Sequence, residues 1–189
     1  MHPRDRLRHA FSPETRQRFK VVQEIRESLL KELCGGLWHT TLLDRYERIL
    51  STGSISPEPD IPDSERWSTS QGKEFYPYVR QLGGVSLFDF ANFDPNTYSE
   101  RCPNSTWRAF VPFLEQSDHA VWIEINRERL QQFIPGEELL KMWKAEVGRA
   151  PKLMPYIEAA NRGPVPTTAF KRVLLVRETQ PNFTSLGCF

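Results

Sequence analysis

The fold prediction starts from Leu37-Trp38-His39-Thr40-Thr41, which is followed at once by Leu42, Leu43, Tyr46, Ile49 and Leu50. Its first part is short and rich in large residues, which favours a β-strand. Its second part spaces apolar residues as a helix does and closes on Gly53, a residue common just past helix ends. The stretch therefore predicts a strand that runs straight into an amphipathic helix.

A second amphipathic helix is expected upstream, over residues 13–34. Ser12-Pro13-Glu14 offers an N-cap, a proline in the first turn and an acid beside the positive helix end. Apolar residues then recur every three to four positions up to Gly35-Gly36, where a helix can end. The first 26 residues carry seven Arg or Lys against three acids, which predicts a basic outer face. Solvation is the plainer interpretation of that face, and contact with nucleic acid is the alternative.

The rest of the chain predicts an α+β protein. Residues 1–36 form a basic helical segment in this interpretation, and residues 37–189 form the main domain. Because the late strands are too closely spaced for helical crossovers between every pair, a fully alternating α/β layout is excluded. The downstream pattern predicts a long loop over residues 51–73 and two strands over 85–90 and 120–125. It then predicts a short helix over 127–132 capped by Asn126, a longer helix over 135–148, and two closing strands over 156–159 and 171–176.

Composition excludes several classes of protein. With 189 residues and 39% hydrophobic residues, the chain can bury a core without metals or disulfides. Its three cysteines, Cys34, Cys102 and Cys188, form no CxxC pair, which indicates a reducing compartment. The first 12 residues hold no apolar run, and no stretch approaches the roughly 18 apolar residues of a membrane span. We therefore expect a cytoplasmic protein without a membrane partner. P-loop, HExxH and GxGxxG motifs are absent from the sequence.

Two positions stand out as candidates for chemistry. His39 ends a strand just before a helix whose free N–H groups favour a phosphate-bearing ligand. The alternative is a half-buried structural histidine, with Thr40 or Thr41 capping the helix. Glu158 lies between apolar residues on a short predicted strand, where an ionised carboxylate is costly unless it is paired or kept for function.

Two further positions are weaker candidates. Glu124 competes with Glu158 for a catalytic role, but it shares one face of its strand with Trp122 and is expected to point outward. Ser86 occupies a strand without the GxSxG pattern of a serine nucleophile. Taken alone, it is expected to be a small residue of the sheet.

In their order, these pieces resemble the ADP-ribosyltransferase superfamily. The opening Leu37 to Gly53 stretch is similar to that of the histidine-type members, and Val85-Ser86-Leu87 stands at the place of the second motif. The closing part is similar to that of bacterial nucleic-acid-modifying toxins, and the resemblance spans about residues 37 to 176. Its closing residues are Tyr156-Ile157-Glu158, Gly163-Pro164-Val165-Pro166 and Lys171-Arg172-Val173-Leu174-Leu175-Val176.

The resemblance implies a split β-sheet core and an enzyme, a toxin or effector, that consumes NAD without a metal. His39 would bind the ribose of NAD, the Thr40 backbone would hold the nicotinamide amide, and Ser86 would support the site. Glu158 would be the catalytic residue at the 2′-hydroxyl of the nicotinamide ribose. Phe88 would stack on the ligand, with two tyrosines, Tyr76 and Tyr78, as alternatives.

The acceptor implied by the resemblance is a macromolecule. Tyr156 stands where an acid or glutamine usually precedes the catalytic glutamate, so arginine is a less favoured acceptor than a nucleobase, another side chain or water. One alternative keeps the fold and moves a 2′-phosphate from RNA to NAD, with Arg66, Arg80 and Arg108 available for the phosphate. The other is a non-catalytic binding module on the same scaffold.

Overall fold

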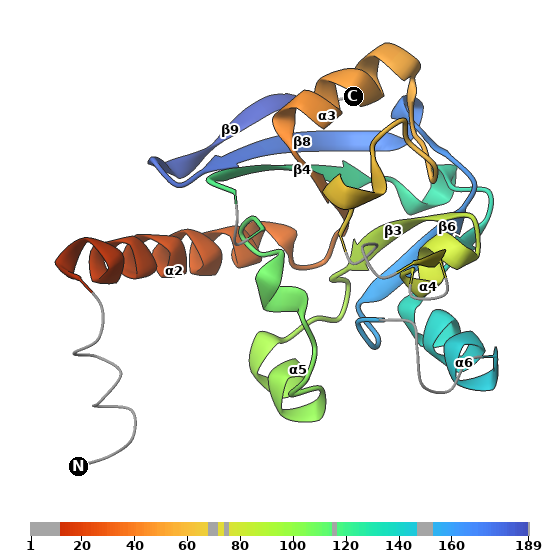
Figure 1. Ribbon diagram of the computed structural model, residues 1–189, viewed down its shortest axis with the longest axis horizontal. Helices are drawn as coiled ribbons and strands as arrows, with labels where there is room; N and C mark the ends of the chain where they lie inside the picture. The colour runs from red at the N-terminus through yellow and green to blue at the C-terminus, as the bar shows by residue number, and fades with distance from the viewer. Residues whose placement is uncertain (1–11, 68–71, 74–75, 115–116, 147–152, 189) are drawn as a thin grey trace.

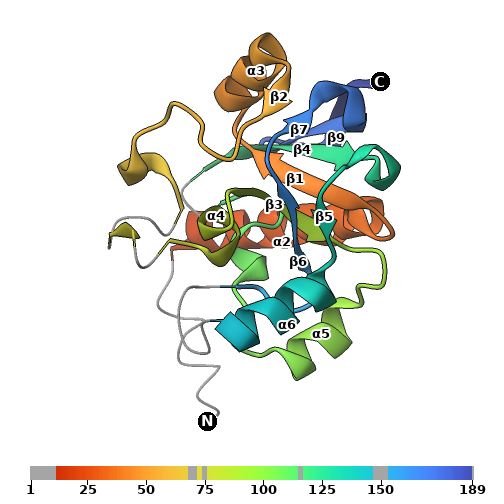
Figure 2. The same cartoon turned by 90° about the vertical axis from the view of Figure 1, so that its right-hand side faces the viewer.

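The structure, a computed structural model, describes residues 12–67, 72–73, 76–114, 117–146 and 153–188. Within this part of the chain the protein has the α+β class expected from sequence (Figures 1 and 2). Antiparallel strands form a seven-stranded sheet of order β5-β6-β3-β1-β4-β8-β9, and β2 pairs with β7 in a small second sheet. The strands are β1 (Leu37–Thr41), β2 (Ser54–Ile55), β3 (Gly84–Asp89), β4 (His119–Ile125), β5 (Phe133–Ile134), β6 (Glu158–Arg162), β7 (Val165–Pro166), β8 (Phe170–Arg177) and β9 (Gln180–Cys188).

The helices cover the sheet and its ends (Figures 1 and 2). The α-helices are α2 (Pro13–Leu33), α3 (Leu43–Thr52), α4 (Tyr78–Gln81), α5 (Pro95–Arg101) and α6 (Gly136–Glu146). Short 3₁₀ turns are η1 (Asp63–Glu65), η3 (Trp107–Ala109), η4 (Arg127–Arg129) and η5 (Thr167–Ala169). The strand-to-helix stretch that opened the prediction is confirmed as β1 and α3, and Gly53 ends α3 at a φ of 76°.

Helix α2 belongs to the same core as the sheet. The Ser12 hydroxyl accepts a hydrogen bond from the backbone N–H of Thr15, as expected for an N-cap. The helix buries Ile25, Leu29 and Leu33 in one hydrophobic cluster with Trp38 and other residues of the sheet. The expected basic outer face is absent from the described helix, which carries five Arg or Lys against four Glu. Half of the basic excess of the first 26 residues falls in residues 1–11, which lie outside the described residues.

The central strands are buried on both faces, which corrects the prediction for Glu124. Trp122 packs into the cluster under α2, whereas Ile123 and Ile125 pack into a second cluster on the opposite face. Glu124 is therefore only 8% exposed, and its carboxylate accepts hydrogen bonds from Lys171 Nζ at 2.7 Å and Arg172 Nε at 2.6 Å. It is a buried, paired carboxylate of β4 rather than an outward one.

Other differences from the prediction lie at element boundaries. The turn after Asn126 is the short η4, not a longer helix, and the chain returns at once as β5. The strand expected from residue 156 begins at Glu158, because Tyr156 adopts a φ of 67° that no strand allows. Strand β9 was not predicted. Val147 and Gly148, expected to end α6, lie outside the described residues.

The sheet splits between β1 and β3, and this split positions the candidate site. The two strands pair only at Leu37 with Asp89 and Trp38 with Phe88. Beyond these pairs β1 follows β4 as far as Thr41, while β3 follows β6 as far as Gly84. On the side of β1 that faces β3, the backbone beyond Trp38 therefore borders a gap rather than a neighbouring strand, while its other side stays paired with β4.

Candidate active site

A cleft of about 1200 Å³ opens at this split, a little above the usual range of ligand pockets. Its walls come from strands β1, β3, β4 and the start of β6, from helices α3 and α4, from the segment between β2 and Trp67, and from the residues around Phe110. All five site residues expected from the sequence line it: His39, Thr40, Ser86, Phe88 and Glu158. The early histidine and the late glutamate therefore border one cavity.

His39 completes the broken hydrogen-bond ladder between β1 and β3. Gly36 O accepts a hydrogen bond from Phe90 N. Along an antiparallel ladder, every second residue of a strand directs its backbone N–H and C=O toward the same neighbouring strand. The next residues of β1 that direct these groups toward β3 are therefore Trp38 and Thr40. The partner position for Thr40 would be Ser86, but the strands have separated there. The Ser86 carbonyl instead accepts from His39 Nδ1, at 3.0 Å.

This contact fixes the protonation of the His39 ring. Burial lowers the pKa of His39, and the weaker opposing effect is the hydrogen bond to Ser86. A carbonyl oxygen can only accept, so Nδ1 carries the proton of the neutral ring. The Nε2 atom of that tautomer is a hydrogen-bond acceptor at the cleft wall.

Glu158 is a buried carboxylate held by neutral donors. It is 5% exposed; its Oε1 accepts from Ser86 Oγ at 2.8 Å, and its Oε2 accepts from Met154 N at 2.8 Å. Burial raises the pKa of Glu158, and the hydrogen bonds from Met154 and Ser86 oppose that shift. Within the described residues, Glu158 forms no ion pair with a lysine, arginine or histidine.

A tight turn brings the Met154 N–H to the carboxylate. Tyr98 Oη donates to Pro155 O at 2.8 Å, and Tyr156 takes its positive φ between that point and β6. Gly136 at the start of α6 packs so closely that an added Cβ would lie 2.0 Å from Tyr156 O. The turn before β6 is therefore fixed from two sides, and with it one of the two donors to Glu158.

The aromatic wall differs from the sequence prediction in part. Phe88 lines the cleft but is 4% exposed, and it packs against Phe110 and Trp122. The tyrosines named as alternatives, Tyr76 and Tyr78, are not among the lining residues, and the Tyr78 hydroxyl donates to Glu146 Oε2 at 2.6 Å.

Sequence reasoning missed the aromatic pair Trp67 and Phe110. Both residues line the cleft, and their rings meet edge to face with centroids 4.9 Å apart. A planar group that enters the cleft has these rings beside it. A tryptophan isolated in a loop rich in proline and acids is the sequence signal that could have indicated this position.

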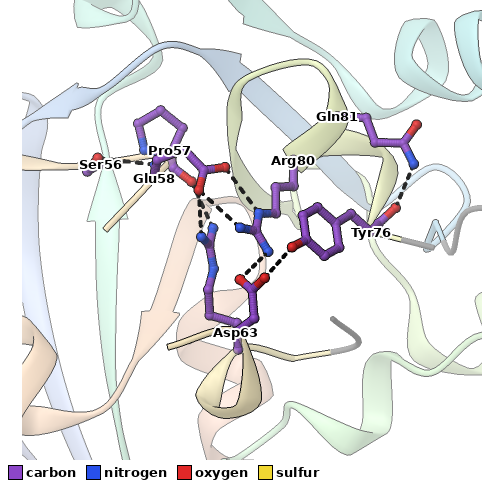
Figure 3. A network of polar contacts seen from close by, with 8 residues as sticks. Ser56, Pro57, Glu58, Asp63, Tyr76, Arg80 and Gln81 are labelled. Atoms are coloured by element: carbon purple, nitrogen blue, oxygen red, sulfur yellow. Dashed lines mark hydrogen bonds and ion pairs between the residues drawn. The ribbon is translucent and has the colours of Figure 1, made fainter. Parts of the chain in front are cut away.

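Charged side chains of both signs line the cleft. The basic lining residues are Arg45, Arg48, Arg66 and Arg80, and the acidic ones are Glu58, Asp60, Glu65 and Glu158. Of the three arginines proposed for a phosphate, Arg66 and Arg80 lie here and both bind Glu58 (Figure 3 shows Glu58 and Arg80). Arg108 does not line the cleft; it donates to Ser99 Oγ and lies over the Trp107 ring.

The described residues hold no group of three or more His, Cys, Asp or Glu side chains arranged to bind a metal ion. In the same part of the chain, no helix has the length and apolar character needed to cross a bilayer. Comparison with protein-family models gave no match, and a search of curated proteins gave none. The function is therefore inferred from the chemistry of the cleft.

Proposed function

We propose that this chain is an NAD-dependent ADP-ribosyltransferase that cleaves the nicotinamide glycosidic bond and transfers ADP-ribose to a macromolecular acceptor. The observation that carries the proposal is the linked set of His39, Ser86 and Glu158 at the split of the sheet. Ser86 joins the other two, because its carbonyl binds the histidine ring while its hydroxyl binds the carboxylate.

Cleavage of the nicotinamide glycosidic bond is promoted by a fixed negative charge beside the ribose. When the C–N glycosidic bond of NAD breaks, nicotinamide leaves with the bonding electron pair and positive charge develops on the ribose. A preorganised carboxylate stabilises that charge strongly, since it needs no reorganisation and little water screens it. Glu158 meets both conditions, being buried and held on both oxygens. The acceptor then attacks the anomeric carbon and loses its proton.

The neighbouring groups suit the rest of the substrate. With Nδ1 committed to Ser86, His39 can accept a hydrogen bond from a ribose hydroxyl through Nε2. The N–H and C=O of Thr40 are directed toward the gap by the alternation of the β1 ladder, and they match the carbonyl and NH₂ of the nicotinamide amide. Trp67 and Phe110 provide apolar faces for a planar ring.

The proposal is tested by incubating the protein with NAD labelled in the nicotinamide and measuring its release, with water as the acceptor of last resort. Glu158→Gln should lower the rate constant roughly 100- to 1000-fold, the usual cost of removing one preorganised electrostatic group. Glu146→Gln is the matched control, because that carboxylate also accepts from a hydroxyl but does not line the cleft. Release that is absent from the folded wild-type protein, or undiminished in Glu158→Gln, would reject the assignment.

A second candidate is the transfer of a 2′-phosphate from RNA to NAD. The specific support is that Arg66 and Arg80 line the same cleft as Glu158. Consumption of a 2′-phosphorylated RNA in the presence of NAD would favour this reaction over transfer of ADP-ribose to an acceptor.

The non-catalytic module is separated from both enzymes by a thermal-shift titration. A ligand that binds only the native state raises its apparent stability, by about 2.7 kcal/mol at one hundred times its Kd. An unchanged melting temperature at saturating NAD and ADP-ribose would favour the binding module, whose ligand would then be another molecule.

A further inference from the structure

The side chain of Glu58 lies at the wall of the cleft and binds two arginines. Its Oε2 accepts from Arg66 Nη1 at 2.8 Å and from Arg80 Nη2 at 3.1 Å, and its Oε1 accepts from Arg80 Nε at 3.1 Å. Figure 3 shows Glu58 and Arg80 facing each other across this contact. All three residues line the cleft.

The two partners of this contact differ in how firmly they are held. The side chains of Arg66 and Arg80 are 15% and 12% exposed, whereas that of Glu58 is 60% exposed. Glu58 comes from the irregular segment between β2 and η1, and Ser56 Oγ accepts from its backbone N–H. The carboxylate is therefore the partner that can leave at least cost.

Arg80 has a second set of contacts that do not depend on Glu58. Its Nη1 lies 2.9 Å from Asp63 Oδ1, and its guanidinium lies 3.7 Å from the centre of the Tyr76 ring (Figure 3). The Tyr76 hydroxyl donates to the same Asp63 carboxylate, which ties the two supports together. Arg80 Nη1 is also fully buried without a well-oriented hydrogen bond. These contacts would keep the guanidinium in place after Glu58 moves away.

The guanidinium fork binds phosphate and carboxylate oxygens with the same geometry. A carboxylate held by two arginines therefore occupies a position that a phosphate group could take. The charges of the cleft point the same way, because its four arginines are matched by four acids while Glu58 is in place. Removal of Glu58 from the arginines leaves the lining of the cleft with an excess of positive charge.

We propose that Glu58 is a built-in competitor for an anion site formed by Arg66 and Arg80, and that the diphosphate of an incoming nucleotide displaces it. The identity of the nucleotide rests on the proposed function, but the competition between carboxylate and phosphate does not. Displacement would remove the side-chain contacts of Glu58, while the hydrogen bond from Arg66 Nη2 to Pro57 O, at 2.9 Å, still ties the segment to Arg66.

Calorimetric titration of the full chain with inorganic pyrophosphate, and separately with ADP-ribose, tests this inference. Glu58→Gln keeps the shape of the side chain but removes its charge, and it should tighten pyrophosphate binding about tenfold, the loss of a competing pair of ion contacts. Glu65→Gln is the matched control, because it removes the same charge from another lining residue of the cleft, whose carboxylate pairs with Arg45 rather than with Arg66 or Arg80. It should change the affinity by less than about threefold.

The arginine variants complete the test. Arg66→Gln should weaken pyrophosphate binding in the wild-type and Glu58→Gln backgrounds alike, and Arg80→Gln should do the same if its melting curve stays cooperative. An affinity unchanged by Glu58→Gln, or raised equally by the Glu65→Gln control, would overturn the inference and leave the proposed enzyme untouched. If nicotinamide release fails but the pyrophosphate pattern holds, the proposed reaction falls and the anion site stands.

Discussion

Ser86→Ala should move the acid limb of the activity profile to higher pH. The Ser86 hydroxyl donates to Glu158 Oε1 at 2.8 Å, and this contact lowers the pKa of a carboxyl that burial raises. A hydrogen bond to a charged group is worth about 1.5–3 kcal/mol, and one pKa unit corresponds to about 1.36 kcal/mol. Because Glu158 is 5% exposed, little solvent can replace the lost donor. The pKa of Glu158 should therefore rise further, by an amount set by the free energy of that hydrogen bond.

The assay is nicotinamide release measured as kcat/KM across pH, together with ¹³C NMR titration of labelled glutamate side chains. If the ionised Glu158 is the active form, activity in Ser86→Ala falls off at a higher pH than in the wild-type protein. Ser99→Ala is the control, since its hydroxyl donates to Pro95 O and does not line the cleft. An acid limb and a glutamate titration that both stay in place would refute the coupling between Ser86 and Glu158.

Three further predictions follow from the same site. Glu158→Gln should stabilise the protein at pH 8 by about 1–3 kcal/mol, because an amide costs less to bury than a carboxylate without an ion-pair partner. Since the folded-state pKa of Glu158 is raised above the ordinary 4.5, this gain should vanish in thermal melts below pH 4.5. A loss of stability at pH 8 would contradict the prediction. Burial lowers the pKa of His39, so its ¹⁵N NMR signals should report the neutral Nδ1–H tautomer at pH 8. A pKa measured above the ordinary 6.5 would contradict this prediction. Gly136→Ala should lower the free energy of unfolding by about 1–3 kcal/mol in denaturant titrations, because the new Cβ displaces the turn at Tyr156. The same displacement should slow nicotinamide release. Full activity in that variant would show that the site does not depend on this turn.

The regular elements could be predicted because their signals are local. Ser12 and Gly53 mark the two helix boundaries through side-chain capping and backbone conformation, which depend on a few neighbouring residues. The pairing of distant strands leaves no such local mark. Strand β9 shows no strand pattern, because its nine residues include a proline, a glycine and only two large apolar residues, Phe183 and Leu186. The outward prediction for Glu124 was wrong because the sequence cannot reveal that α2 covers the Trp122 face of the sheet.

The candidate site was predicted as a set of separate residues, without the contacts that join them. The bond between Ser86 and Glu158 spans 72 positions and depends on the register that pairs Phe88 with Glu158. The bond from Met154 depends on a positive φ at Tyr156, a conformation that the sequence around it does not demand. The binding of Glu58 to two arginines joins a loop without periodicity to Arg80 of α4, a contact that no local pattern predicts.

The most direct measurement is a crystal structure of the Glu158→Gln variant with NAD, since that variant should bind the dinucleotide but turn it over slowly. The nicotinamide ribose should lie within hydrogen-bond distance of the residue 158 side chain and of His39 Nε2, with the amide group against the Thr40 backbone. A dinucleotide bound elsewhere, or a cleft left empty at saturating NAD, would contradict the proposal that this split in the sheet is where the glycosidic bond breaks.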